Sequence, residues 1–304
     1  MSGGSWGTRR TVIVVLIVVA VGAVLVAFWL WPDDRSRAVP TDEVVRNYRA
    51  SSIPTTSDQV PSSTIAPSTA ASTTSATTAP TTAVGTTAAS STVASSTTEP
   101  TLELPEPGVY RYATSGWEDV DALNGARHDY PDETTITVTD EGCGVRLRWD
   151  ALRERRDEWR LCATELGIEL QPDAIQYHEF FQQPELEHLD CDRSVVVVPA
   201  GAPPTDPVVQ SCFLEQDPWI ATWTAPEPTT HTVAGNEVPA WHVQMTVDDD
   251  DQYWEHTTLD WFFDDRGLPV AMASTKESNS PSPIGDVLYR ENYELSAVSL
   301  TPLR

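Results

Sequence analysis

The sequence predicts a mainly β domain that follows one membrane-spanning helix and a disordered linker. An uninterrupted apolar run occupies residues 12–31, Ser and Thr dominate residues 51–100, and strand-like alternation recurs after residue 101. The predicted organisation is therefore a cytoplasmic tail (1–10), a transmembrane helix (11–32), a disordered Ser/Thr/Ala/Pro-rich stalk (33–101) and an extracytoplasmic β-rich domain (102–304).

The apolar run at residues 12–31 has the length and flanks of a membrane span. Its 20 uncharged residues rise about 1.5 Å each and so cross a hydrocarbon core of roughly 30 Å. Arg9 and Arg10 precede the run, whereas Asp33 and Asp34 follow it, which places the N-terminus in the cytoplasm. A cleaved signal peptide, the competing interpretation, needs a shorter apolar core and a small-residue cleavage site. The sequence therefore predicts a single-pass protein of the cell membrane that contacts the bilayer through this run.

The predicted stalk has a composition that cannot bury a core. Residues 51–100 contain 27 Ser or Thr, and most of the rest are Ala or Pro, which favours disorder and is typical of O-glycosylated tracts. Upstream, Thr41 precedes Asp42 and Glu43, and Arg49 follows. This pattern fits a short helix capped by Thr41, and it fits a polar spacer equally well.

Charge is concentrated in the predicted β domain. Residues 101–304 carry 13 basic and 39 acidic side chains, which account for the whole net charge of −26. A domain this acidic repels phosphate backbones, so a nucleic-acid partner is excluded.

Strand signals are clearest in the last third of the chain. Helical periodicity is weak throughout, with the best candidates at 119–126 and 173–183. The alternation predicts an antiparallel meander in which Asp248–Asp251 and Asp264–Gly267 form turns. The residues that share the inward face of its strands are Trp241, Val243, Met245, Val247, Leu259, Trp261 and Phe263.

The four cysteines, Cys143, Cys162, Cys191 and Cys212, all lie in the β domain. Outside the cytoplasm an even number of cysteines favours disulfides. Three pairings are open, and Cys143–Cys162 with Cys191–Cys212 is favoured because each bridge closes a hairpin-sized segment. A metal site would use His188 near Cys191, but no second close pair completes four ligands, so no metal is predicted.

The motif search gives no support for catalysis. His178 and Glu179 begin a zinc-protease motif, but Gln182 stands where the second His is required. The inverted motif would need His in place of Pro184. The run Asp248–Asp251 lacks the ligand spacing of a calcium-binding loop. The sequence therefore predicts a protein that is not an enzyme and has no cofactor.

Aromatic content is the most informative feature of the β domain. Eight Trp residues follow residue 100. A filled sheet core explains most of them, and an apolar pocket for a lipid-like ligand is the functional alternative. The candidate pocket residues are Trp219, Trp223, Trp241, Met245, Leu259, Trp261 and Phe263.

One hairpin resembles a known superfamily. Residues 258–270 read Thr-Leu-Asp-Trp-Phe-Phe-Asp-Asp-Arg-Gly-Leu-Pro-Val and resemble a hairpin of LolA-like proteins, and residues 235–241 resemble the strand entry before it. These proteins include lipoprotein carriers, a lipoprotein-sensing regulator and mycobacterial glycolipid carriers. The resemblance covers residues 235–300 and implies a single curved antiparallel sheet, half-barrel-like, around an apolar cavity. The chain departs from the pattern in its four cysteines and in lacking clear plug helices.

These observations lead to two main functional hypotheses. The first is a membrane-anchored extracytoplasmic domain that binds an apolar or lipidic ligand, or a lipidated partner, at the cell envelope. The second is a stalked interaction module that recognises a protein or cell-wall polymer without an internal pocket. A surface hydrolase, the third and weakest, requires a cleft with converging His and carboxylate groups. An enclosed apolar cavity separates the first hypothesis from the second.

Overall fold

The computed structural model describes residues 36–52, 102–122, 125–214, 217–249, 254–282 and 285–304. Within these ranges the chain forms one helix and fifteen strands. The helix α2 spans Thr41–Ser52. The strands are β1 Gly108–Val120, β2 Ala126–Asp129, β3 Glu133–Glu141, β4 Gly144–Asp150, β5 Arg155–Ala163, β6 Gly167–Phe180, β7 Gln183–Cys191, β8 Val195–Pro199, β9 Val208–Leu214, β10 Asp217–Trp223, β11 Glu227–Val233, β12 Asn236–Asp249, β13 Glu255–Phe263, β14 Pro269–Ser282 and β15 Gly285–Ala297.

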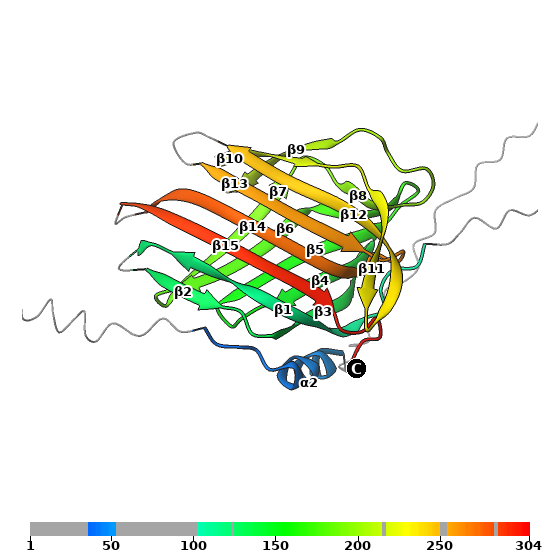
Figure 1. Cartoon of the computed structure of the whole chain (residues 1–304), viewed down its shortest axis with the longest axis horizontal. Helices are drawn as coiled ribbons and strands as arrows, with labels where there is room; N and C mark the ends of the chain where they lie inside the picture. Colours follow the sequence, from blue (N-terminus) through cyan, green and yellow to red (C-terminus); the bar gives the residue numbers. More distant parts are fainter. Residues whose placement is uncertain (1–35, 53–101, 123–124, 215–216, 250–253, 283–284) are drawn as a thin grey trace, which may run out of the picture.

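Twelve strands close into an antiparallel barrel (Figure 1). Around the ring the order is β10, β9, β7, β6, β5, β4, β3, β1, β15, β14, β13 and β12, and β12 pairs again with β10. The other three strands are attached outside this order, β2 on β1, β8 on β6 and β11 on β12. The predicted half-barrel is therefore wrong, because the pairing of β12 with β10 closes the ring and leaves it no open edge. Closure gives the backbone groups of both edge strands a partner.

Two short ladders complete the ring. Strand β10 pairs with β12 through three residues, Ala221–Trp223. Strand β7 pairs with β9 through three residues that end at Cys191 and Cys212. The other neighbouring strands share longer ladders, such as the twelve pairs between β14 and β15. The wall is therefore least supported by backbone hydrogen bonds on either side of the β9–β10 hairpin.

The antiparallel pairing predicted for the last third is confirmed. In the β12–β13 ladder Trp241 faces Phe263 and Val243 faces Trp261. The weak helix candidate at 173–183 forms the β6–β7 hairpin instead, and the candidate at 119–126 includes the end of β1 and the start of β2. Strand pairing across the barrel overrides the weak helical pattern at these positions.

The turn before β14 explains why its glycine is required. Gly267 has a φ of +82°, and a Cβ at this position would lie 3.1 Å from the side chain of Ile168. Asp264 holds the turn, since its carboxylate accepts the backbone N–H of Leu268 at 2.9 Å. Only glycine combines this left-handed conformation with so close an approach to the barrel interior.

Helix α2 packs on the outside of the barrel, close to the C-terminus (Figure 1). Val44 and Val45 are buried against Val109 of β1. The hydroxyl of Thr41 donates to the Glu133 carboxylate at 2.8 Å and so ties the helix to β3, in place of the predicted capping role. Residues that the sequence assigns to the stalk thus form part of the folded unit. The rest of the stalk, residues 53–101, lies outside the described residues.

The predicted membrane anchor has no support in the structure. Residues 11–32 and the tail before them lie outside the described residues. Across the described ranges, no helix has the length and apolar character needed to cross a membrane. The structure therefore does not support the predicted single-pass protein of the cell membrane.

The barrel interior is filled at one end and hollow at the other. Large side chains less than 2 % exposed pack near the β13–β14 turn, among them Leu161, Ile168 and Leu268. Towards the β6–β7 and β14–β15 turns, inward positions carry smaller or polar side chains. On β14 the inward series after Met272 is Ser274, Lys276, Ser278 and Ser280. The three serines leave the space in which the candidate site lies.

Candidate functional site

A cavity of about 760 Å³ occupies the hollow half of the barrel. This volume lies within the range of roughly 300–1,000 Å³ that small-molecule sites show. Both walls of the barrel contribute to it, from β5, β6 and β7 on one side and β13, β14 and β15 on the other. Gln183 and Glu185 of the β6–β7 hairpin line the cavity and are exposed to solvent, which places the opening at this end.

The deeper part of the cavity is aromatic. Trp159 and Trp261 meet edge to face, with ring centroids 4.9 Å apart. Trp223 lines the cavity beside them, and its indole N–H donates to the Gln210 side chain at 2.6 Å. Trp261 is fully buried, yet its indole N–H has no acceptor among the described residues. The aromatic rings therefore offer stacking area to a ligand, whereas the N–H of Trp261 is covered by protein atoms and is not open to the cavity.

A buried ionic network forms the polar part of the cavity wall. Arg155 projects from β5 and lies 3.0 Å from the Glu291 carboxylate of β15. It also forms an ion pair with Asp157 and lies 3.5 Å from the Glu118 carboxylate. All four side chains are at most 4 % exposed. Glu118 and Glu291 stand directly opposite each other in the β1–β15 ladder, where two carboxylates without a cation would repel each other. Arg155 lies close to both and offsets this repulsion.

Glu118 is the centre of the hydrogen bonds in this network. Its two oxygens lie 3.0 Å from His128 Nδ1 and 3.2 Å from His178 Nδ1. The hydroxyl of Tyr289 lies 3.0 Å from Glu118 and 2.8 Å from Glu291, so one proton serves two carboxylates. Burial opposes the charge of Glu118, but the hydrogen bonds from the two histidines outweigh it and lower its pKa to about 2. Glu118 therefore stays ionised inside the protein.

The pKa of Asp157 shifts in the opposite direction to that of Glu118. Burial dominates there and raises the pKa of Asp157 to about 6, although Arg155 attracts its charged form. The pKa of Arg155 itself is raised well above its usual value, because Asp157 and Glu291 outweigh the effect of burial. The cavity wall thus holds a permanent cation beside a carboxyl group that takes up a proton in mildly acidic solution.

Lys276, the one lysine of the chain, also lines the cavity. Its Nζ lies 3.2 Å from the Glu255 carboxylate and 5.9 Å from the centroid of the Tyr289 ring. Burial disfavours its charge, but attraction by Glu255 and then Glu187 raises the pKa of Lys276 above its usual value. Lys276 therefore stays protonated, and its ammonium group is already paired with a carboxylate of the protein.

Aromatic rings and a tight turn border the opening. Phe180 stacks on His128 with ring centroids 4.6 Å apart, and it meets Tyr289 edge to face. The turn between β6 and β7 places two non-glycine residues in the left-handed region, Phe181 at φ 54° and Gln182 at φ 59°. Each such residue costs about 1 kcal/mol. Phe181 also lines the cavity, so this turn stands at the cavity rim.

The structure places five of the seven predicted pocket residues on the cavity wall. Phe263 is not among them, because it is fully buried in the filled half and stacks on Trp261 at 5.1 Å. Trp241 is also absent, since it packs against the core beside Phe263 and Pro228. The five that line the cavity are Trp219, Trp223, Met245, Leu259 and Trp261.

Sequence reasoning missed the ionic part of the wall. The signal was the two-residue period, because Arg155 and Asp157 share the face of Trp159, and Glu291 lies between Tyr289 and Tyr293 on the inward face. The sequence analysis assigns no role to these charged residues, although they alternate with outward residues in the same way as their aromatic neighbours. The two-residue period places these residues on the inward face, and their charge indicates that part of the interior is polar.

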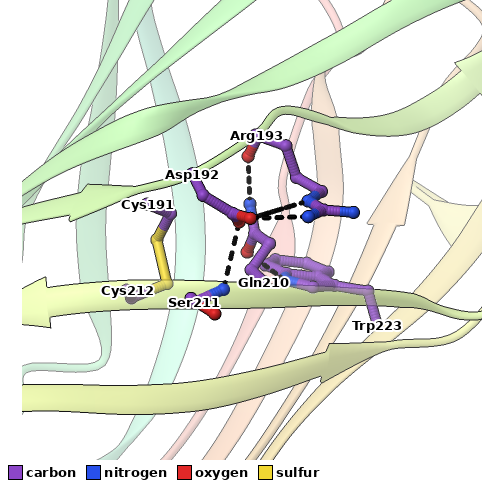
Figure 2. Close-up of a disulfide and its surroundings, with 7 residues drawn as sticks. All are labelled: Cys191, Asp192, Arg193, Gln210, Ser211, Cys212 and Trp223. Carbon is purple, nitrogen blue, oxygen red and sulfur yellow. Dashed lines mark hydrogen bonds and ion pairs between the residues drawn. A yellow bond between two sulfur atoms is a disulfide. The ribbon is translucent and has the colours of Figure 1, made fainter.

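Two disulfides are confirmed, in the pairing that the sequence favours. Cys143 is joined to Cys162 and Cys191 to Cys212. Figure 2 shows the second bridge at the short β7–β9 ladder, where Asp192 accepts the N–H of Ser211 at 3.0 Å. Gln210 is held there as well, between the Arg193 carbonyl and the Trp223 indole. The bridge and these hydrogen bonds reinforce the wall where few backbone bonds hold it.

Metal binding finds no support in the described part of the chain, where no three His, Cys, Asp or Glu side chains converge on a common point. Asp250 and Asp251 of the acidic run lie outside the described residues. No family model, curated protein or solved structure matches the chain. Fold and site together define a closed antiparallel barrel with an aromatic and ionic internal cavity.

Proposed function

We propose that the protein binds an amphipathic, lipid-like ligand inside its barrel and does not act as an enzyme. The single observation that carries this proposal is the cavity of about 760 Å³ with Trp159, Trp223 and Trp261 at its deeper end. The alternative, an interaction module with a filled core, predicts no such space. Burial of about 200 Å² of apolar ligand surface against these rings would contribute roughly 5 kcal/mol before the cost of immobilising the ligand.

The polar wall limits the ligand to amphipathic molecules. A purely apolar molecule would lie against Glu187, Glu255 and Lys276, which are partly exposed, without replacing their interactions with water. A molecule with one polar end matches the division of the cavity into aromatic and ionic parts.

A cavity-filling substitution tests this proposal. Ala174 lines the cavity between Trp159 of β5 and Leu189 of β7. We expect Ala174→Trp in the full chain to abolish quenching of tryptophan fluorescence by amphiphilic probes. The control, Ile175→Trp, adds the same side chain on the opposite face of β6, where the residue does not line the cavity. Equal probe binding by both variants would place the ligand outside the barrel and refute the proposal.

A further inference from the structure

The cavity wall carries more negative than positive charge, and this imbalance bears on the head group of the ligand. Five carboxylates and two cations line the cavity, which leaves a formal charge of −3 with His178 neutral. Arg155 is shared among three buried carboxylates, and Lys276 is paired with Glu255. Neither cation is available to an anionic ligand without the loss of an existing ion pair.

Glu187 of β7 is the least compensated of these carboxylates. Its side chain lines the cavity and is partly buried, opposite the wall that carries Lys276. Within the described part of the chain it has no hydrogen bond and no cation within 4 Å, and its electrostatic effect is felt at Lys276. A carboxylate in this position favours a second cation at the cavity opening.

The aromatic rings are an independent observation that points to the same occupant. Trp159 and Trp223 line the deeper end of the cavity, and Tyr289 lines it near the opening. The neighbouring Trp rings and Tyr289 present the electron-rich faces that attract ammonium groups. Lys276 already lies over the Tyr289 ring in this way.

We propose that the ligand is a cationic amphiphile, with an amine or quaternary ammonium head between Glu187 and Glu255 and an apolar chain against the tryptophans. This inference rests on the proposed function, because it names the polar end of the ligand that the cavity binds. It excludes fatty acids and other anionic amphiphiles as preferred ligands. The head group would add a positive charge where the wall has an excess of negative ones.

Three probes with the same alkyl chain test the inference: dodecylamine, dodecanol and dodecanoate. Each is titrated into the full chain by calorimetry, below the concentration at which it forms micelles. We expect dodecylamine to bind at least about tenfold more tightly than dodecanol, and dodecanoate to bind more weakly than dodecanol. Ala174→Trp should remove all of this binding, which separates the cavity from the acidic outer surface.

Two substitutions with opposite effects locate the head group. Glu187→Gln should weaken dodecylamine binding several-fold and leave dodecanol unchanged. Lys276→Gln frees Glu255 and should strengthen dodecylamine binding, an effect that a purely structural role would not produce. The matched control is Asp190→Asn, which removes a carboxylate from the outward face of the same strand and should change neither probe.

The outcomes distinguish this inference from the proposed function. If the alcohol binds and the amine has no advantage, or if dodecanoate binds most tightly, the cationic head is refuted and the barrel remains a ligand-binding cavity. If amine binding survives Ala174→Trp, the amine is held by the outer surface and the inference fails. If none of the three probes binds, the proposed function fails and the inference fails with it.

Discussion

Replacement of Glu118 by Gln should destabilise the protein strongly at neutral pH and much less in acid. The side chain is fully buried and meets His128, His178 and Tyr289 at 3.0–3.2 Å. Its pKa falls from the usual 4.5 to about 2 in the folded protein. At about 1.36 kcal/mol per pH unit this difference corresponds to roughly 3 kcal/mol of stability at pH 7.

The sign follows from which state binds the proton more tightly. The folded-state pKa of Glu118 lies below the unfolded value, so its charge stabilises the protein above pH 4.5, and this contribution is lost as the pH falls towards 2. Glu118→Gln should therefore lower the free energy of unfolding by about 3 kcal/mol at pH 7 and by less than half of that at about pH 3.

The assay is equilibrium unfolding in urea, followed by tryptophan fluorescence at both pH values. Glu227→Gln is the control, because it removes an exposed carboxylate on β11 and should change stability by less than about 0.5 kcal/mol at either pH. A loss below about 1 kcal/mol for Glu118→Gln at pH 7, or an equal loss at both values, would refute the assigned role of the buried network.

Three further predictions follow from other parts of the barrel. Replacement of both Cys191 and Cys212 by Ser should lower stability by about 2–4 kcal/mol, measured by thermal unfolding, because only three residue pairs join β7 to β9 there. Gln182→Gly should raise stability by about 1 kcal/mol by relieving a φ of 59°, and an unchanged melting temperature would contradict this. The pKa of Asp157 is raised to about 6, so the folded state takes up its proton first, and stability should rise as the pH falls from 7 towards 4. Asp157→Asn should remove this rise.

Part of the fold follows directly from the sequence. The alternation in Trp241, Val243 and Met245 correctly predicts a strand and its partner, because a two-residue period fixes which face is buried. Closure of the barrel has no comparable local signal. It depends on two three-residue ladders between β9–β10 and their neighbours, and nothing in those short segments specifies the partner strand.

The candidate site was predictable in its apolar half alone. Five aromatic or aliphatic residues were identified because large side chains at inward positions indicate either core or pocket. The choice between core and pocket depends on residues that are small, such as Ala174 and Ser274, and small inward residues are common in any strand. Arg155 and Glu118 act together across the interior from β5 to β1, a contact that only the closed barrel creates.

Native mass spectrometry of the full chain, purified without detergent from a lipid-containing host, tests the central claim most directly. The account predicts a population that retains one amphiphile, and loss of that mass in Ala174→Trp but not in Ile175→Trp. A bare mass for every variant, even after incubation with dodecylamine and dodecanol, would contradict the claim that the barrel binds a ligand.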